Sequence, residues 1–379
     1  MERRPVCLIV ATVASGGSMG AAVARDAREA LARGFAVYVA SGRAELPQEL
    51  RKAGVGQIRI GGKVDAGMHY LLAGMADAEG RGSVIATLRF VAAMRRLRPS
   101  RIIMHNLHGR YLNLAIFVRQ LRKEVARGVE LVWMLHDFWP VTGHCAFLPP
   151  EGCLRFSEAD GCHDCPMSKA YPRTLAGRAR SNFRRKKRLL EPLAEHSIVR
   201  VVSRWQAALI EKSFFGQARM ELHRPLVDEA FTPPRADERR LGFALCVAYP
   251  WQKFKGLDDL PALHRALPRG MQLLVVGLDE KQARKLRPLG INCAPRQTTP
   301  EALAWYYRHA AVYISVSYAE TYGLTVREAI ACDTPVALYA VGGITEGLED
   351  HPKVRAVPCG DVNALARAAI ELAESAPGR

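Results

Sequence analysis

The chain has 379 residues, of which 49% are hydrophobic and 24% are charged. These are the proportions of a folded globular protein, so they argue against disorder, and the length accommodates two domains of ordinary size. The formal net charge is +17, which indicates a polyanionic partner such as a nucleotide diphosphate, a lipid phosphate, an anionic membrane surface or a nucleic acid. No stretch approaches the ~20 apolar residues that a membrane-spanning helix needs.

An apolar run near the N-terminus leads directly into a glycine loop. Residues 7–13 predict a buried strand, Gly16, Gly17 and Ser18 form the loop, and Ser18 is the expected cap of a helix that ends at Gly34. A signal peptide would explain the apolar run but not the loop and helix after it, so we expect a cytoplasmic protein. The loop is not G-x-G-x-x-G, which argues against NAD binding.

Two later strands of this half are expected at residues 101–104 and 130–135, and each is followed by polar residues. These residues are His105, Asn106, His108, His136 and Asp137. Ligands of open α/β sheets bind at the carboxyl ends of the strands, so all five are candidate substrate contacts. The alternative is that some are buried structural histidines whose hydrogen bonds are satisfied, above all His108.

Four of the nine cysteines lie close together in the sequence: Cys145, Cys153, Cys162 and Cys165. The run G-C-H-D-C-P forms a tight turn between the last two, and four thiolates would complete a tetrahedral zinc site. The first two lack this short spacing, so reduced, packed thiols and a disulfide or redox pair remain alternatives to a structural zinc. The other cysteines are scattered and predict small core residues.

A basic segment covers residues 171–188, which contain eight Lys and Arg residues and no acid. Its composition is typical of a solvated helix face, of a helix on an anionic membrane, or of a helix that contacts RNA. The proline-rich and charged residues 224–240 predict a linker. We therefore expect a first domain at 1–225 and a second at 226–361.

The second domain is expected to repeat the strand-loop-helix pattern. Lys253 and Lys255 follow its first strand, and Glu320 follows a later strand, with Gly323 at the turn into a helix that contains Glu328. Free backbone N–H groups at a helix start favour a phosphate, whereas carboxylates suit sugar hydroxyls.

Four stretches resemble one family. The run E-T-Y-G-L-T-V-R-E-A-I-A-C-D-T-P-V, with the glycine pair at 342–343 and Glu346, resembles the donor-site signature of glycosyltransferase family 4. The segments M-H-N-L-H-G-R-Y-L-N and W-M-L-H-D-F-W-P-V-T-G-H-C, and the first glycine loop with its helix, resemble the WcaC-like branch for colanic-acid-type polysaccharides. The resemblance implies an α/β protein of GT-B fold, with two Rossmann-like, doubly wound domains facing a cleft and the helix at 362–379 packed back on the first domain.

The resemblance also implies roles for individual residues. The catalytic candidates are His136, near the anomeric centre of the transferred sugar, Glu320, and Lys255, which holds the donor pyrophosphate. The donor-binding candidates are Gly16, Gly17, Ser18, Lys253, Tyr322, Gly323, Leu324 and Glu328, the last for the ribose hydroxyls. The acceptor candidates are His105, Asn106, His108 and Asp137. The sequence departs from the family at Phe254, where an arginine is expected and Lys253 is the substitute, and at Asp333, where glycine is usual.

The predicted function is thus a retaining transfer of a sugar from a UDP- or GDP-sugar to a saccharide hydroxyl, with a lipid-linked acceptor in surface polysaccharide synthesis. No cofactor is expected in catalysis, and the enzyme would be cytoplasmic or peripheral on the inner membrane face. The alternative is a basic GT-B protein that binds nucleic acid or anionic lipid without catalysis, although the sequence has no nucleic-acid motif. A sugar epimerase or phosphorylase of the same fold is a third possibility.

Overall fold

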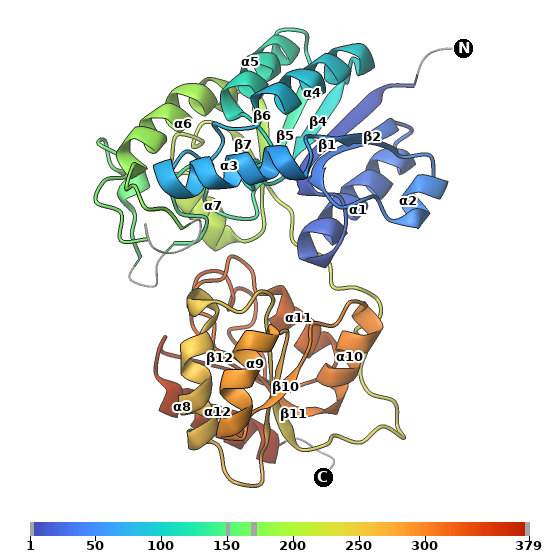
Figure 1. Cartoon of the computed structure of the whole chain (residues 1–379). Coiled ribbons are helices and arrows are strands. Elements are labelled where there is room, and N and C mark those ends of the chain that lie inside the picture. The colour runs from blue at the N-terminus through green and yellow to red at the C-terminus, as the bar shows by residue number, and fades with distance from the viewer. Residues whose placement is uncertain (1–3, 149–151, 168–172, 376–379) are drawn as a thin grey trace. The chain divides into compact units, whose positions relative to one another are not determined.

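The computed structural model describes residues 4–148, 152–167 and 173–375 (Figure 1). The chain forms two compact units that divide between His223 and Arg224, two residues from the predicted boundary. Residues 171–172 of the basic segment and 376–379 of the expected C-terminal helix lie outside the described residues. No helix of the described chain is long and apolar enough to cross a membrane.

The first unit is built on a seven-stranded, wholly parallel sheet of order β3-β2-β1-β4-β5-β6-β7. Its strands are β1 (Val6–Val13), β2 (Ala36–Arg43), β3 (Gly56–Arg59), β4 (Arg101–Met104), β5 (Glu130–Met134), β6 (Ser197–Val201) and β7 (Arg219–Leu222). Its helices are α1 (Gly17–Ala32), α2 (Gln48–Lys52), α3 (Lys63–Ala76), α4 (Val84–Leu97), α5 (Leu114–Val125), α6 (Ala179–Ala194) and α7 (Arg204–Ile210), with a 3-10 turn η1 (Arg155–Ser157).

The central strands of this sheet are almost entirely buried, because helices cover both faces. β1 reads VCLIVATV, and side chains of its two faces belong to two different hydrophobic clusters, one around Leu8 and Val10 and the other around Cys7 and Ile9. This is the near-continuous apolar pattern of a parallel strand that is packed on both sides. The strand order reverses between β1 and β4, so the loops that follow these two strands start at the switch point of the sheet.

The second unit has a six-stranded parallel sheet of order β10-β9-β8-β11-β12-β13. Its strands are β8 (Phe243–Val247), β9 (Leu273–Val276), β10 (Asn292–Ala294), β11 (Ala310–Ser315), β12 (Val336–Tyr339) and β13 (Val354–Val357). Its helices are α8 (Leu260–Ala266), α9 (Glu280–Leu286), α10 (Pro300–His309), α11 (Leu324–Ala331) and α12 (Val362–Glu374), with 3-10 turns η2 (Lys253–Lys255), η3 (Leu257–Asp259) and η4 (Arg287–Leu289). Here the switch point lies between β8 and β11. The two parallel-sheet, Rossmann-like units confirm the predicted α/β class.

The placement of the last helix differs from the prediction. We expected residues 362–379 to pack on the first domain, but α12 packs on β11, β12, β13 and α8 within the second unit. Its apolar face, with Leu365, Ala369 and Leu372, is buried in the core of that unit. This hydrophobic face explains the difference, because the second sheet already buries it.

The start of α1 also differs. The helix begins at Gly17 rather than after Ser18, and no side chain caps it. The residues 224–240 contain turns but neither helix nor strand, as expected of a linker.

Candidate active site

The glycine loop after β1 presents the start of α1 without a side-chain cap. Gly16 and Gly17 have φ angles of 86° and 63°, in the left-handed region that glycine adopts without strain. Both are exposed, as is Ser18. Because the first backbone N–H groups of a helix have no partner within it, this loop can bind an anion.

Beside this loop, at the end of β4, a buried chain of side chains leads from α1 to His136. His105 is only 2% exposed, and its Nδ1 lies 2.9 Å from Nε2 of His136. Its Nε2 lies 3.1 Å from Oδ2 of Asp26, and the two imidazole rings are stacked. The Asp26 carboxylate favours a proton on Nε2 of His105. One of the two facing nitrogens, Nδ1 of His105 and Nε2 of His136, donates to the other across 2.9 Å.

Charge and burial keep His136 neutral. Burial, and next the charge of His105, lower the pKa of His136 to about 3. Burial would raise the pKa of Asp26, but the hydrogen bond and charge of His105, with His223 and Arg200, lower it instead. Asp26 is therefore ionised and His136 uncharged near neutral pH, which suits His136 to accept a hydrogen bond from a sugar hydroxyl.

The second polar pair of this unit joins the ends of β4 and β5. Nε2 of His108 lies 2.7 Å from Oδ2 of Asp137, and Oδ1 of Asp137 accepts from the N–H of Trp139 at 2.9 Å. Burial opposes ionisation, but the Asp137 charge raises the pKa of His108, and the His108 charge lowers the pKa of Asp137. They form a buried ion pair, which matches the structural alternative for His108. Both carboxylate oxygens of Asp137 already have partners within this unit.

The remaining acceptor candidate, Asn106, is half-buried, and its backbone oxygen accepts from Thr12 Oγ1 at 3.1 Å and from Tyr111 OH at 2.9 Å. These bonds fix the loop backbone after β4. The structure thus brings Asn106, His105 and His136 to one edge of the sheet, with His105 buried behind His136 rather than exposed to an acceptor.

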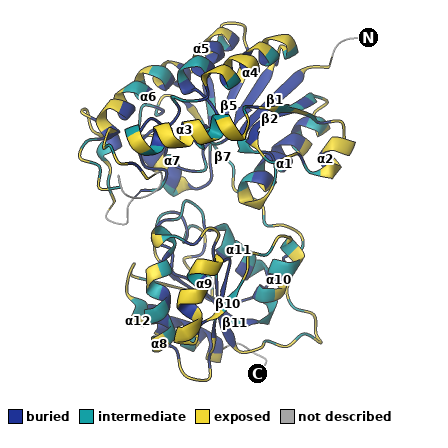
Figure 2. Ribbon diagram, in the orientation of Figure 1, coloured by how far each residue is buried: buried dark blue, intermediate teal, exposed yellow. Residues whose placement is uncertain are grey.

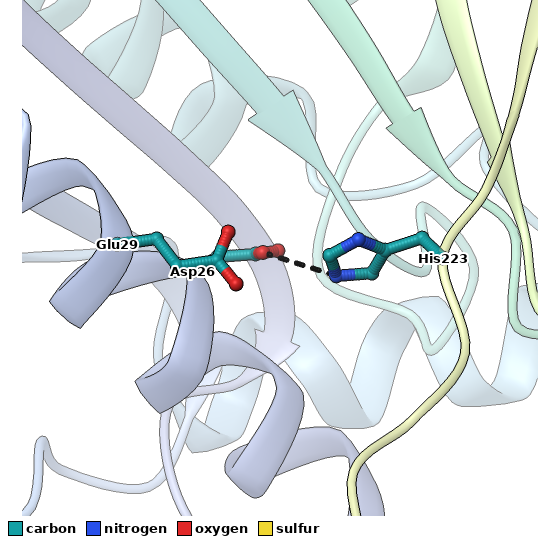
Figure 3. A group of neighbouring side chains, drawn as sticks. All are labelled: Asp26, Glu29 and His223. Carbon is teal, nitrogen blue, oxygen red and sulfur yellow. Dashed lines mark ion pairs between the residues drawn. The ribbon is translucent and has the colours of Figure 1, made fainter.

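Figure 3 shows a group that satisfies the distances of a metal site: Asp26 and Glu29 on α1, and His223 after β7. Their ligand atoms lie within 4.8 Å of one another. Asp26 already contacts cationic and imidazole groups, because Arg200 lies 3.6 Å from its Oδ1 and His105 lies on its Oδ2. Glu29 pairs with Arg25 at 2.9 Å. These partners account for the charges of Asp26 and Glu29, and we assign no metal to this group.

In the second unit, the loops on the two sides of the switch point are joined by an ion pair. Nζ of Lys255, at the end of η2 after β8, donates to Oε1 of Glu320, after β11, at 2.6 Å. The next residue, Gly256, has a φ of 75°, and a Cβ there would meet the Val316 carbonyl oxygen at 2.0 Å. This close approach holds Lys255 against the end of β11. Two of the three predicted catalytic residues are therefore in direct contact.

Lys253 does not join this pair. Its side chain is 90% exposed, and its Nζ lies 3.8 Å from Oδ2 of Asp258. Phe254, at the position where an arginine was expected, is half-buried, and its carbonyl oxygen accepts from the N–H of Tyr318 at 2.8 Å. The backbone at Phe254 therefore fixes the loop, while its side chain supplies no charge. Lys255 is the partly buried cation of the loop.

The turn before α11 is shaped by Gly323. Gly323 has a φ of 73° and precedes α11 without a side-chain cap, and a Cβ there would meet Ile344 Cγ1 at 2.4 Å. The N–H of Gly343 donates to the carbonyl oxygen of Glu320 at 3.1 Å. The two glycine loops thus pack together, and the backbone N–H groups around Tyr322, Gly323 and Leu324 lie beside Glu320. This arrangement fits the predicted phosphate-binding turn.

Glu328 lies one turn further along α11 and is held by Tyr307, whose OH donates to Oε2 at 3.1 Å. Burial raises the pKa of Glu328 to about 7, although the Tyr307 hydrogen bond lowers it. A carboxyl group that exchanges its proton near neutral pH can accept from or donate to ribose hydroxyls.

Asp333 lies at the other end of α11, away from these N–H groups. It has a φ of 58°, which explains why glycine is usual at such a position. Its Oδ1 accepts from Lys353 Nζ, and its carbonyl oxygen accepts from Arg240 at 2.7 Å. This departure from the family pattern therefore concerns the end of a helix rather than the candidate site.

The sequence analysis missed Asp26 and Glu79. Glu79 fixes the loop after β4, since its Oε1 accepts from the N–H groups of Gly109 and Arg110, both at 2.9 Å. The sequence could have identified Asp26 as a buried carboxylate, because it lies between Val23 and Ala27 on the apolar face of the predicted helix. A charge buried there requires a partner. Nothing in the sequence identified that partner as His105.

A comparison with known protein families covers several of the site residues described above. The family model described as "Glycosyl transferases group 1" matches residues 245–375, which contain Lys255, Glu320 and Glu328. The chain carries a group 1 glycosyltransferase domain. The glycine loop and the histidines of the first unit lie before the matched range.

Individual relatives agree with this family match. The chain is 34% identical to the D-inositol 3-phosphate glycosyltransferase of Mycobacteroides abscessus over 164 residues, 37% of this chain and 36% of that protein. It is 31% identical to the putative colanic acid biosynthesis glycosyl transferase WcaC of Escherichia coli K12 over 141 residues, 37% of this chain and 34% of that protein. The chain thus aligns with about a third of the length of these curated relatives.

The solved structures show the fold. Sucrose-phosphate synthase from Thermosynechococcus elongatus superposes with a TM-score of 0.67 at 18% identity, covering 98% of this chain and 90% of that one. Anabaena Alr3699/HepE in complex with UDP and glucose superposes with a TM-score of 0.62 at 14% identity, covering 97% and 90%. The chain therefore has the GT-B fold that was expected, and WcaC, which the resemblance named, is among its relatives.

Proposed function

We propose that the protein is a retaining glycosyltransferase that moves a sugar from a UDP- or GDP-sugar to a hydroxyl group of a saccharide in surface polysaccharide synthesis. The observation that carries this proposal is the Lys255–Glu320 pair at the switch point of the group 1 domain. The UDP and glucose of the Anabaena structure and the colanic acid role named for WcaC support the donor and the product class.

The second unit supplies what the donor requires. Negative charge develops on the leaving diphosphate, and Lys255 together with the backbone N–H groups at Gly323 can stabilise it. Lys255 is paired with Glu320, so the diphosphate would replace Glu320 as a partner of the ammonium group. Glu320 would then be released toward the hydroxyls of the sugar, and Glu328 would bind the ribose.

The reaction itself needs no protein nucleophile. In the proposed step, the bond between C1 of the sugar and the phosphate oxygen breaks, and its electron pair stays on the phosphate. The acceptor oxygen forms a bond to C1 on the same face, and its proton passes to the departing phosphate oxygen. His136 contributes as a neutral acceptor that positions the sugar, and the buried chain through His105 to Asp26 positions His136.

We also propose that the enzyme works on a lipid-linked acceptor at an anionic membrane, and the support comes from α3. The buried side of this helix is formed by His69 and Ala73, and His69 Nδ1 lies 2.9 Å from Ser83 Oγ. Much of the rest of α3 is exposed (Figure 2). Its exposed apolar residues are Val64, Met68, Tyr70, Leu71, Leu72 and Met75. An apolar patch of this kind marks an interaction surface.

The basic segment adjoins this patch. The N–H of Leu175 donates to the carbonyl oxygen of Gly74 in α3 at 2.8 Å, and Leu175 is itself 82% exposed. Arg173 and Arg178 are exposed on either side of it. Apolar side chains flanked by arginines suit the interface of an anionic bilayer, in which the rings and aliphatic chains enter the acyl boundary and the cations face lipid phosphates. The sequence shows the apolar residues between positions 64 and 75. From the sequence, however, we expect a membrane contact only in the basic segment.

The experiment for the transferase proposal is a screen of UDP- and GDP-sugars with the purified chain, with release of the nucleoside diphosphate as the signal. Turnover that is lost in Glu320→Ala and Lys255→Ala would support it. Salt-sensitive nucleic-acid binding without any nucleotide-sugar turnover would instead favour the non-catalytic alternative.

A further inference from the structure

The loop between β5 and α6 gathers the four clustered cysteines. Sγ of Cys145 and Sγ of Cys165 lie 3.8 Å apart, and neither residue is in a disulfide. Two sulfurs that bind one zinc ion tetrahedrally at ~2.3 Å are separated by about this distance. The charges of Cys162 and Cys153 also act on Cys145, so all four thiols share one region. In the described chain no three of these sulfurs lie within 4.8 Å of one another, so binding would draw Cys153 and Cys162 inward.

Backbone N–H groups are directed at two of these sulfurs. The N–H of Gly143 donates to Sγ of Cys162 at 3.1 Å, and the N–H of Met167 hydrogen-bonds Cys165. In the second case, the donor lies two residues after the cysteine, in a tight turn. Such bonds stabilise a thiolate more than a thiol, because the acceptor carries the charge.

A histidine next to the cluster lacks one hydrogen-bond partner. His144 is 2% exposed, and its Nδ1 lies 3.0 Å from Oδ1 of Asp77. Its Nε2 is buried without any partner in the described part of the chain. His144 directly precedes Cys145 in the chain, so this buried nitrogen belongs to the same loop as the cysteines. A histidine whose other nitrogen is held by a carboxylate is the usual arrangement next to a bound metal.

A buried lysine near the cluster indicates that negative charge is needed there. Lys186 on α6 is 3% exposed, and its ammonium group contacts the carbonyl oxygen and the ring of Trp139, which carry no formal charge. A buried ammonium needs a negative neighbour. Burial lowers the pKa of Lys186 to about 8, and negative charge on Cys162 and on Asp77 would oppose this effect. Burial raises the pKa of the Cys162 thiol to about 11, so without a metal Cys162 supplies no such charge near neutral pH. A zinc ion bound by four thiolates carries a net negative charge, whereas four neutral thiols carry none.

We propose that Cys145, Cys153, Cys162 and Cys165 bind one structural zinc ion, with Asp77 and His144 beside it. The ion would tie the loop to the end of β5, where the N–H of Phe138 donates to the carbonyl oxygen of Ala146 at 2.9 Å. It would thereby fix the segment that carries His136 and Asp137, and would hold Lys186 in place on Trp139.

The test is metal analysis of the full-length chain, purified without chelator and without added metal. The expected result is about one zinc ion per chain, which is lost in Cys162→Ser and in Cys165→Ser. Cys359→Ser, which removes an exposed cysteine outside the cluster, should retain the zinc. If the serine variants do not fold, wild-type protein in which Co²⁺ replaces zinc should show the strong visible absorption of a tetrahedral thiolate site.

Two results would overturn the proposal. The first is a folded wild-type chain without metal that gains none from added Zn²⁺ and whose four cluster thiols all react with a thiol reagent, which would show packed thiols. The second is an intact mass that is lower by two hydrogens and is restored by reduction, which would show a disulfide in the cluster.

Discussion

Lys255 and Glu320 are joined by a 2.6 Å ion pair that links the loops after β8 and β11, on the two sides of the switch point in the second sheet. These strands are neighbours in the sheet although 62 residues of chain separate Val247 from Ala310. The pair lies in the part of the chain that matches the group 1 family model. It places a cation and a carboxylate where a diphosphate and a sugar would meet in the proposed reaction.

Lys255 and Lys253 should differ sharply in their effect on activity. Lys255→Ala removes the partly buried cation that we assign to the donor diphosphate, and we expect kcat/KM to fall by ~100-fold or more. Lys253→Ala removes a side chain that is 90% exposed, and we expect a loss of less than about 5-fold, since an exposed charge is well screened. Steady-state kinetics of both variants checks this. Equal losses would show that Lys253 binds the donor as well as Lys255 does.

Asp26 should act on the sugar only through His105 and His136. Asp26→Asn leaves the tautomer of His105 unspecified, so we expect kcat to fall by ~10-fold with little change in donor KM. Glu29→Gln is the matched control, because Glu29 is on the same helix as Asp26 (Figure 3) but pairs with Arg25. His136→Asn, tested for nucleotide-sugar turnover, should show a larger loss than Asp26→Asn. A loss in Glu29→Gln as large as that in Asp26→Asn would contradict the positioning role.

Glu328 should make stability depend on pH. Its pKa is raised from an ordinary 4.5 to about 7, so the folded chain holds this proton over a range in which the unfolded chain has lost it. The free energy of unfolding should therefore fall as the pH rises from 4.5 to 7, by at most ~3 kcal/mol. Glu328→Gln should remove this part of the pH dependence. Urea unfolding of both proteins at pH 5 and pH 8 measures it, and equal pH dependence would contradict the assignment.

The exposed face of α3 should bind anionic vesicles. Leu71→Glu places a charge on the apolar patch, and we expect co-sedimentation with phosphatidylglycerol vesicles to drop at least ~10-fold while stability changes little. Leu241→Glu, at an exposed leucine of the second unit, is the control and should bind like the wild-type protein. Equal binding by both variants, or equal binding to neutral phosphatidylcholine vesicles, would contradict a docking site at α3 for anionic membranes.

Asp333→Gly tests whether the departure from the family pattern matters. Glycine relieves the positive φ of 58° but removes the contacts of the Asp333 carboxylate with Lys353 and Arg240. These effects oppose each other, so we expect a change in stability of less than about 1 kcal/mol and unchanged donor kinetics. A clear change in donor KM would show that the end of α11 affects the site.

The fold was predictable from the sequence because its signals are local. Apolar strand runs such as residues 7–13 and 101–104, each followed by a polar or glycine-rich loop and a helix, predict parallel sheets without any knowledge of long-range contacts. The sheet on which α12 packs was not predictable in this way. Its apolar face shows that Leu365 and Leu372 will be buried, but not against which sheet.

The candidate site was predictable only in part, for the same reason. Glu320 and His136 each follow a strand, so their place at a sheet edge could be inferred. Which partner each would meet depends on contacts across the sheet. The role of His105 changed from an acceptor contact to a buried partner of His136 once Asp26 was located behind it.

The most direct test of the central claim is an NMR time course with the nucleotide sugar that gives turnover in the UDP- and GDP-sugar screen. The account predicts a glycoside with the anomeric configuration of the donor, formed together with one nucleoside diphosphate, and loss of both signals in Glu320→Ala. A product of inverted configuration, or undiminished turnover in Glu320→Ala, would contradict it.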